Sequence, residues 1–515
     1  MYLLSAYSFM CFFIYLNAKV LPNNKNYDSK RLQLLAEEAQ AAVGASIELN
    51  AEEKQANDIL MTWKNKELEE AFTNPHYFNL SKHYFTYRDD IGKSKVYQII
   101  RKMPKGAALH IHSSMMLDVD TMMTFTYEEN LYICFRDEDF SLFFSIAPPK
   151  QHCKNDWAPL ILVRSMSDNS TRFDEEFRRF FALHPQDPED FIHADINSVW
   201  KKFDKVYYVI KTLISYRPVR EKFIYESLKK FYEDNVMYVE LRTGLHNLYE
   251  LNGTVHDRKY IVELYKRVTN KFIADHPDFI GIKLIVTRHR RQNETQVKEA
   301  LNIVKSLKSE MPDMIAGFDL VGQEDLGKPL SEFVSVLNEA KGEVDFFFHA
   351  GETAWSGTAT DENLFDALLL GSKRIGHAYA LIKHPALIQS LIKKNIAVEV
   401  NVISNNVLSL IHDVRNHPLA TYLAVGLPVV LSSDDPGAWG ADPLSHDFFV
   451  AFMGIASKHA DLRLLKRLAL NSIQYSALED KRKGRLLDVF NRRWEIFIKD
   501  IIETHAELYL PYTQV

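Results

Sequence analysis

The sequence predicts an α/β protein built on a closed barrel of eight parallel strands and eight helices, a (β/α)8 or TIM barrel. Eight short apolar runs alternate with helical segments, which is the arrangement found in such a barrel. Four of these runs end in histidine or carboxylate residues, and the C-terminal ends of barrel strands carry the chemistry of this fold. Residues 113–235 separate the first run from the second. Because one strand–helix unit needs far fewer residues, an inserted module is expected there.

The overall composition is that of an ordinary soluble chain. Its 515 residues carry a formal net charge of -6 and are 46% hydrophobic. That length fits two domains, or one large barrel with insertions. The mild acidity gives no basic footprint for nucleic acid, and no window after the first twenty residues is long and apolar enough to span a bilayer. We therefore expect no nucleic-acid partner and no transmembrane segment in the mature chain.

The N-terminus has the pattern of a secretory signal peptide. Residues 2–18 are almost entirely apolar and end in Leu16-Asn17-Ala18, ahead of Lys19. An uncleaved signal anchor is the alternative, and it fits less well because the apolar run is short. The sequence thus predicts a signal peptide over residues 1–18 and a secreted, extracellular protein.

Cysteine usage agrees with secretion. Of the three cysteines, Cys11 would leave with the signal peptide, so the mature chain keeps Cys134 and Cys153. In an oxidising compartment these can pair and close a loop of 153 − 134 = 19 residue steps. Two free, buried cysteines are the alternative. We place both in a small disulfide-bonded module over residues 126–185. Four N-glycosylation sequons, which suit an extracellular protein, begin at Asn79, Asn169, Asn252 and Asn293.

Residues 19–98 are expected to form a helical extension ahead of the barrel. The segments 32–42 and 51–72 are rich in strong helix formers. None of the candidate metal-binding residues lies in these two segments. We expect an extra helical layer or a dimer contact.

The catalytic barrel is expected over residues 99–125 and 186–515. The segment over 462–503 is expected to be helical and to pack across it. The expected strands are 107–112, 236–242, 281–286, 314–320, 345–349, 373–377, 396–400 and 428–432, and helical segments between them include 295–308, 330–340, 385–394 and 417–425.

Four residues at strand ends suit a zinc ion. His110 and His112 stand two residues apart on the first strand, so their imidazoles point the same way, into the barrel. His349 comes from the fifth strand and Asp434 from the eighth. Three nitrogens and one oxygen suit zinc and leave an open position for a water or hydroxide nucleophile. We therefore expect one Zn²⁺ per subunit.

Three neighbouring residues have no ligand role and are free for proton transfer or hydrogen bonding. Glu352 lies three residues past a ligand and is placed as a general acid. His377, at the end of the sixth strand, is placed to hold or deprotonate a zinc-bound water. Asp435, beside a ligand, is placed to accept a hydrogen bond from substrate. The alternative for each is a structural hydrogen bond. Together with the ligands they indicate a zinc hydrolase.

The order of four motifs resembles the adenosine deaminases. These motifs are Met103-Pro-Lys-Gly-x-x-x-His-x-His112, His349-Ala-Gly-Glu352, Arg374-Ile-Gly-His377 and Ser432-Ser-Asp-Asp-Pro436. The helical extension, the signal peptide, the cysteine-containing insertion and Ala316-Gly-Phe-Asp-Leu-Val-Gly322 resemble the secreted branch, the adenosine deaminase-related growth factors. The similarity runs from about residue 30 to residue 503.

This resemblance implies a barrel of the metal-dependent amidohydrolase type that deaminates adenosine or 2′-deoxyadenosine and releases ammonia. It also implies a homodimer built from the N-terminal helices, and a growth-factor role in which residues 126–185 contact a cell-surface receptor or glycan.

The resemblance also assigns roles to individual residues. The four ligands keep their role, Glu352 would protonate purine N1, His377 would serve the attacking hydroxide, and Asp435 would meet the purine on its other nitrogen side. The resemblance further implies substrate contacts by the backbone of Gly322, by Trp200 and Asp204 on the ribose side, by His289, and by Trp355 as a pocket-lining residue.

Three positions depart from the family pattern. Ser113 stands where the family usually has Asp, Asp204 stands where it usually has Glu, and Asn401-Val402 precedes Ile403 where Cys-Pro or Asn-Pro is usual. None is a proposed ligand or the proposed acid, so the expected effect is on nucleoside affinity. Two alternatives remain: a barrel amidohydrolase for another substrate, and a receptor-binding growth factor with weak or no catalysis.

Overall fold

The computed structural model describes residues 26–74, 79–136, 139–153, 155–183 and 194–506, and the backbone of Lys25. The expected signal peptide lies outside these ranges. Within them, no helix combines the length and the apolar character needed to cross a membrane.

The barrel has the eight parallel strands that the sequence predicts. They form two four-stranded sheets, in the orders β1-β5-β8-β9 and β10-β11-β12-β13. Two parallel bridges, Phe318 with Phe346 and Ile111 with Asp434, join the sheets and close the barrel. The strands are β1 (Gly106–His112), β5 (Val236–Thr243), β8 (Gly281–His289), β9 (Ile315–Val321), β10 (His349–Ala350), β11 (Arg374–His377), β12 (Ala397–Val400) and β13 (Val429–Leu431).

The fifth strand is shorter than the sequence predicts. Only His349–Ala350 forms β10, although the apolar run begins at residue 345. Side chains replace the backbone partners here: the amide of Phe348 donates to the Ser372 hydroxyl at 3.1 Å, and that of His349 donates to the Asp319 carboxylate at 2.9 Å. The regular ladder is therefore interrupted where the site residues begin.

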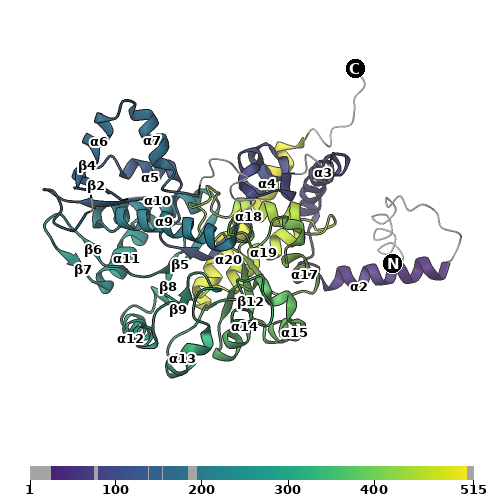
Figure 1. Ribbon diagram of the computed structural model, residues 1–515. Coiled ribbons are helices and arrows are strands. Elements are labelled where there is room, and N and C mark those ends of the chain that lie inside the picture. The colour runs from purple at the N-terminus through teal and green to yellow at the C-terminus, as the bar shows by residue number, and fades with distance from the viewer. Residues whose placement is uncertain (1–24, 75–78, 137–138, 154, 184–193, 507–515) are drawn as a thin grey trace, which may run out of the picture.

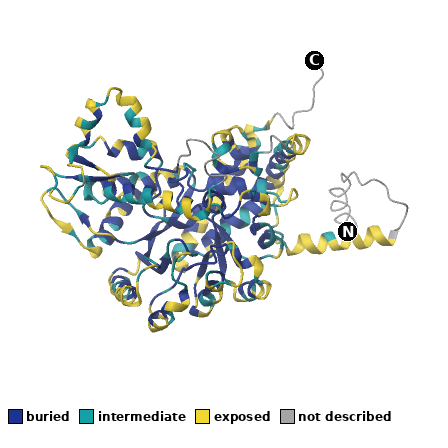
Figure 2. Ribbon diagram, in the orientation of Figure 1, coloured by how far each residue is buried: buried dark blue, intermediate teal, exposed yellow. Residues whose placement is uncertain are grey.

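Helices surround the strands; the outer ones bury one apolar face, whereas α16 and α18 are buried along their whole length (Figures 1 and 2). In α12 the capping box of Asn293 and Gln296 starts the helix, and Val297, Leu301 and Val304 recur on the buried face. The helices are α4 (Lys95–Lys102), α5 (Val119–Phe125), α9 (Ile196–Ile214), α10 (Arg217–Glu233), α11 (Arg258–Asp275), α12 (Glu294–Glu310), α13 (Val334–Ala340), α14 (Ala359–Leu370), α15 (Pro385–Lys394), α16 (Val402–Val407), α17 (Leu419–Ala424) and α18 (Ser445–Val450).

The segment expected to be helical over 462–503 forms two helices. The chain forms α19 (Leu462–Gln474) and α20 (Asp480–Thr504), with a turn between them. In that turn the carbonyl of Tyr475 accepts from Arg374 at 2.8 Å, and the amide of Ala477 donates to Glu240. Two buried charged side chains at the barrel floor thus take the backbone groups that a continuous helix would use internally.

The N-terminal extension consists of two helices with different surroundings. Helix α2 (Lys25–Ala41) projects from the body and is almost wholly exposed (Figure 2). Helix α3 (Ala51–Thr73) packs against α20. There the buried Glu53 carboxylate accepts from Trp494 at 2.7 Å, and the buried Lys64 ammonium donates to the carbonyls of Ser457 and Ala460 at 3.0 and 2.7 Å.

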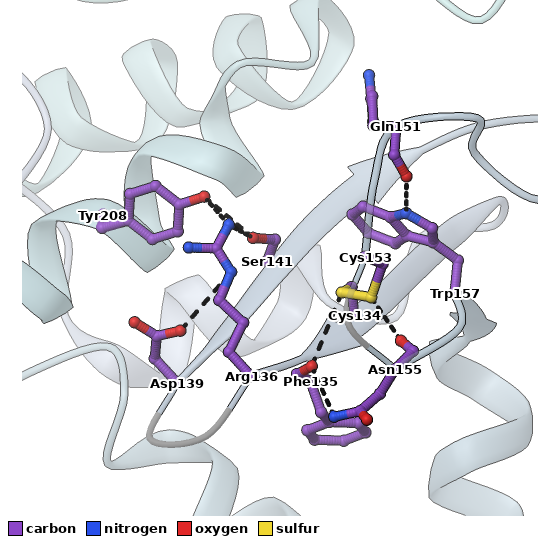
Figure 3. Close-up of a disulfide and its surroundings, with 10 residues drawn as sticks. All are labelled: Cys134, Phe135, Arg136, Asp139, Ser141, Gln151, Cys153, Asn155, Trp157 and Tyr208. Atoms are coloured by element: carbon purple, nitrogen blue, oxygen red, sulfur yellow. Dashed lines mark hydrogen bonds and ion pairs between the residues drawn. A yellow bond between two sulfur atoms is a disulfide. The ribbon is translucent and has the colours of Figure 1, made fainter.

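The insertion between β1 and β5 contains a small antiparallel sheet beside two short helices (Figure 1). Its elements are β2 (Leu131–Phe135), β3 (Phe140–Phe144), β4 (Ala158–Pro159), α6 (Leu160–Met166) and α7 (Ser170–Arg178). The predicted disulfide joins Cys134 on β2 to Cys153 in the loop ahead of β4, with a Cα–Cα distance of 6.0 Å (Figure 3). The bridge therefore fixes this loop to the sheet.

Candidate active site

The four predicted ligands converge at the C-terminal end of the barrel. The Nε2 atom of His110 lies 3.1 Å from Nε2 of His349 and 3.3 Å from Oδ1 of Asp434. Nε2 of His112 lies 3.0 Å from the same carboxylate oxygen. All four ligand atoms lie within 4.8 Å of one another. Three imidazole nitrogens and one carboxylate oxygen at this spacing suit one zinc-sized cation.

Buried carboxylates fix two of these histidines from behind. Glu399 on β12 lies 2.7 Å from Nδ1 of His110, and Asp319 on β9 lies 2.6 Å from Nδ1 of His349. A proton held at Nδ1 leaves the lone pair of Nε2 pointing into the centre, which is the tautomer that binds a metal. Burial also lowers the pKa of His349 to about 3, although Asp319 opposes the shift. The neutral ring is therefore the prevailing form.

Two buried arginines hold these carboxylates ionised. Arg242 on β5 bridges Asp319 and Glu399 at 2.8 and 2.7 Å. Arg374 on β11 binds Glu399 and Glu240, each at 2.6 Å. Burial alone would raise the pKa of Glu399, but the two guanidinium groups hold it well below the usual range. A chain of alternating charges therefore runs from the floor of the barrel to the ligands.

Unusual backbone conformations at two strand ends help to direct side chains into the site. Asp434 and His377 both adopt left-handed conformations, with φ of 61° and 59°. Such values are uncommon for residues other than glycine and cost conformational energy. Each turns the chain sharply where a strand ends, and the side chain then faces the centre of the barrel.

Glu352 is a buried acid beside the ligands. Burial, and then the charges of Asp434 and Glu324, raise its pKa well above the usual range, so it holds its proton at neutral pH. Its Oε1 lies 3.3 Å from Nδ1 of His377. Behind it, Glu324 accepts from the amide of Glu352 and pairs with Arg290 at 3.0 Å. The acid is thus protonated and held in place.

His377 and Asp435 complete the polar wall. Burial lowers the pKa of His377 well below its usual value, so the ring is neutral, and its Nε2 lies 3.9 Å from Oδ2 of Asp434 without a hydrogen-bond partner. Burial and the neighbouring Asp434 raise the pKa of Asp435, whose Oδ1 also has no partner. The raised pKa favours the protonated form of Asp435, which can donate a hydrogen bond as well as accept the one expected from the sequence.

The residues expected to contact substrate lie in different environments, some half-buried and others exposed. His289 ends β8 and packs against Gly322 after β9, where a Cβ atom would lie 2.5 Å from the imidazole Nε2. Trp200 and Asp204 lie on α9, and the Trp200 ring stacks edge-on against Phe203. Trp355, expected to line a pocket, is 65% exposed. Ser113, the departure after the ligands, is buried, and its carbonyl accepts from Arg220 at 3.3 Å.

Sequence reasoning missed the supporting charges. Asp319 and Glu399 are each the single charged residue of an apolar strand, Arg242 shares β5 with Glu240, and Arg374 begins β11. A charge in a strand buried on both faces needs a partner, because desolvating it alone is costly. The charged residues within these apolar strands could therefore have been noticed in the sequence, but only the folded barrel shows which charges pair.

Comparison with known proteins identifies close relatives of this chain. A family described as adenosine deaminase matches residues 182–492, and one described as adenosine/AMP deaminase N-terminal matches residues 8–100. Adenosine deaminase 2 of Homo sapiens is 42% identical over 481 residues, which cover 92% of this chain and 94% of that protein. Adenosine deaminase of Phlebotomus duboscqi is 40% identical over 488 residues, which cover 94% of each.

Solved structures agree at the level of the fold. An Arabidopsis N6-mAMP deaminase superposes with a TM-score of 0.55 at 20% identity, over 77% of this chain and 99% of that one. An amidohydrolase from Burkhoderia ambifaria with bound Zn gives a TM-score of 0.54 at 18% identity, over 79% and 95% of the two chains. The predicted (β/α)8 barrel is therefore confirmed.

Proposed function

This chain belongs to the adenosine deaminase family, and from that premise we propose that it is a secreted zinc enzyme. It hydrolyses adenosine and 2′-deoxyadenosine to inosine and deoxyinosine, with release of ammonia. The observation that carries the proposal is the convergence of three histidines and Asp434 next to the protonated Glu352.

The donor set fits a zinc ion. His110, His112, His349 and Asp434 would hold it, and the Nδ1 contacts to Glu399 and Asp319 direct two of the ring lone pairs toward the centre. Oδ1 of Asp434 is buried without a hydrogen bond, as expected of an oxygen kept for a cation. When bound, zinc supplies a water nucleophile that ionises near neutral pH.

Glu352 and Asp435 would orient and activate the purine from two sides. Glu352 donates its proton to N1, which makes C6 more electrophilic toward water. N7 on the other side of the ring is a hydrogen-bond acceptor. Asp435 suits it as a donor, because its pKa is raised and it retains a proton. Two protonated carboxyl groups would thus replace the water that solvates the free base.

His377 would hold the attacking water. Its ring is neutral and buried, and its Nε2 faces Asp434 without a hydrogen-bond partner. The ring can therefore accept a hydrogen bond from water and fix its direction of approach to C6. Water adds at C6 and ammonia leaves, so the reaction consumes one water and needs no other reactant.

An ultraviolet assay that follows adenosine conversion to inosine tests the proposal. Purified protein should turn over adenosine and 2′-deoxyadenosine, lose activity with a chelator, and regain it when zinc is returned. Elemental analysis should give one zinc per chain. No turnover with a full zinc content would favour a barrel amidohydrolase for another substrate. No turnover and no bound metal would favour the non-catalytic growth factor.

Extracellular location is supported by the disulfide and by the sequons. Asn169, Asn252 and Asn293 are exposed, and Asn79 is half-buried. Intact-mass analysis of the secreted protein should show an N-terminus at Lys19, one disulfide between Cys134 and Cys153, and glycan mass that a glycosidase removes. Two free thiols, or a chain that begins at Met1, would contradict this part of the proposal.

We also propose two protein-binding surfaces. Residues 126–185 display exposed apolar side chains and line a cavity of about 540 Å³ with Arg136 and Trp157, which suits a receptor. Those side chains are Tyr127, Phe135, Ile146, Ile161, Leu162 and Met166. In residues 19–98, α2 exposes Leu32 and Leu34, which suits a homodimer contact. Light scattering of full-length protein and of a Leu32→Lys/Leu34→Lys variant tests the dimer; a monomeric wild type would refute it.

A further inference from the structure

A second polar cavity lies next to the active site, on the far side of Ser113. It has a volume of about 20 Å³, which is room for one occupant the size of a water molecule or a small ion. It lies between the first two barrel strands and α9, α10 and α11, which run close together (Figure 1). Its polar lining is Ser113, Ser114, Lys211, Ser215, Arg220, Thr243 and His246.

The lining of this pocket is positively charged. Lys211 and Arg220 line it directly, and Arg288 donates to the carbonyl of Gly244 in its wall at 3.0 Å. Arg258 lies close enough to act on the charges of both Arg288 and His246. Within the described ranges, no carboxylate forms an ion pair with Lys211, Arg220, Arg258 or Arg288. The charge of the pocket is therefore uncompensated.

The titration of these groups reflects the same crowding. Burial, and then the charges of Lys211 and Arg288, lower the pKa of His246 to about 4, so its ring is neutral. Burial and the nearby Arg258 lower the pKa of Arg288 to about 10. A cationic group resists protonation in this way when it is desolvated next to like charges without a counter-ion.

Arg220 provides an independent sign of a missing partner. Its side chain is 93% buried (7% exposed), and its Nε has no hydrogen-bond partner. Its other nitrogens contact the carbonyl of Ser113 at 3.3 Å and the hydroxyl of Tyr265 at 2.6 Å, and both partners are neutral. Leaving a buried, charged donor unpaired costs free energy.

We propose that this pocket binds a single small inorganic anion, chloride in the extracellular medium, between Lys211, Arg220 and the hydroxyl groups of Ser113 and Ser114. The anion neutralises the cluster and fixes the two serines that directly follow His112. The polar side chains of its lining can donate a hydrogen bond or carry positive charge, which favours an anion over water. The proposal does not depend on the zinc chemistry.

Thermal unfolding of the full-length protein in two sodium salts tests the proposal. At constant ionic strength, replacing gluconate by chloride should raise the melting temperature saturably, by about 2 °C when chloride exceeds its dissociation constant roughly tenfold. Lys211→Met should remove this rise. Lys201→Met, at an exposed position on the same helix, should keep it. Equal melting temperatures of the wild type in both salts would overturn the proposal, and that comparison needs no variant.

Crystallography with bromide gives the location. Crystals grown with sodium bromide in place of chloride should show an anomalous peak between the side chains of Lys211 and Arg220. A fully occupied water there, without anomalous signal, would refute the proposal even if a salt effect on unfolding were seen, because that effect would then arise elsewhere.

Discussion

The metal cluster and the anion pocket lie on opposite sides of Ser113 and treat buried charge in opposite ways. In the metal cluster, Arg242 and Arg374 are each paired with two carboxylates. In the anion pocket, Lys211 and Arg220 have no carboxylate partner among the described residues. The difference shows that the metal cluster contains the counter-charges of its arginines, whereas the anion pocket, within the ranges that the structure describes, lacks counter-charges for its cations. A network whose cations already have carboxylate partners can orient ligands rigidly, whereas cations without such partners need an ion from solution.

Replacing Glu352 removes the proposed proton donor of the active site but leaves all four proposed metal ligands in place. Glu352→Gln should leave zinc bound and lower kcat by about 10²–10⁴-fold, the usual contribution of a general acid. Steady-state assays and elemental analysis measure the two quantities. His349→Ala is the matched contrast and should lower zinc content as well, because it removes one of four ligands. Wild-type turnover in the glutamine variant would remove Glu352 from the mechanism.

Asp319→Asn uncouples a ligand from its supporting charge. The amide still reaches Nδ1 of His349 but lacks the negative charge that Arg242 neutralises. Zinc affinity should fall about 10–100-fold, as is typical when such a partner is lost. Competition with a chromogenic chelator measures it. Asp345→Asn, whose carboxylate pairs with Lys308 at the barrel surface, should leave the affinity unchanged. Equal losses in both variants would mean that the effect is general destabilisation.

Ser113→Asp would make the anion pocket resemble the metal cluster. The new carboxylate would meet Arg220, whose Nη2 lies 3.5 Å from the Ser113 hydroxyl. It should replace the proposed chloride, so the melting temperature should no longer depend on chloride. The same carboxylate can accept a ribose hydroxyl, worth about 1.5–3 kcal/mol. KM for adenosine should then fall about tenfold or more with little change in kcat. An unchanged or raised KM would make Ser113 structural, and a persisting chloride effect would separate it from the pocket.

The smallest effect is expected at the edge of the pocket. Arg258 is exposed, so water and salt screen its charge. Arg258→Met should change anion affinity by about 0.2–1 kcal/mol, at most about fivefold. The chloride concentration at half-maximal stabilisation measures this change. A loss as large as that of Lys211→Met would move the anion outward, to the surface around Arg258.

The same contrast marks what the sequence could and could not predict. His110, His112, His349 and Asp434 were predictable because barrel topology brings all strand ends to one rim. Glu352 followed from its distance along the chain to a ligand. Arg220 and Lys211 were not predictable, because each is an ordinary cation on an amphipathic helix until the fold sets it against a strand end without a partner.

Two details of the fold that the sequence did not predict have a shared physical cause. The helical segment over 462–503 is divided in two where Arg374 and Glu240 bind the backbone of Tyr475 and Ala477. The fifth strand is short because Asp319 and Ser372 bind amides that a strand neighbour would otherwise accept from. Local patterns describe what a segment favours alone, and long-range contacts from buried side chains override it.

The bridge between Ile111 and Asp434, which closes the barrel, can form only after most of the chain has been synthesised. His110 and Asp434 are 434 − 110 = 324 residues apart in the chain, and β1 pairs with the segment after β13. At about 5–20 residues per second, the ribosome makes the last ligand roughly 15–65 s after the first. Until then, the edge of β1 that bridges to Asp434 has no strand partner. The set of four residues that fits a metal ion is therefore complete only near the end of synthesis.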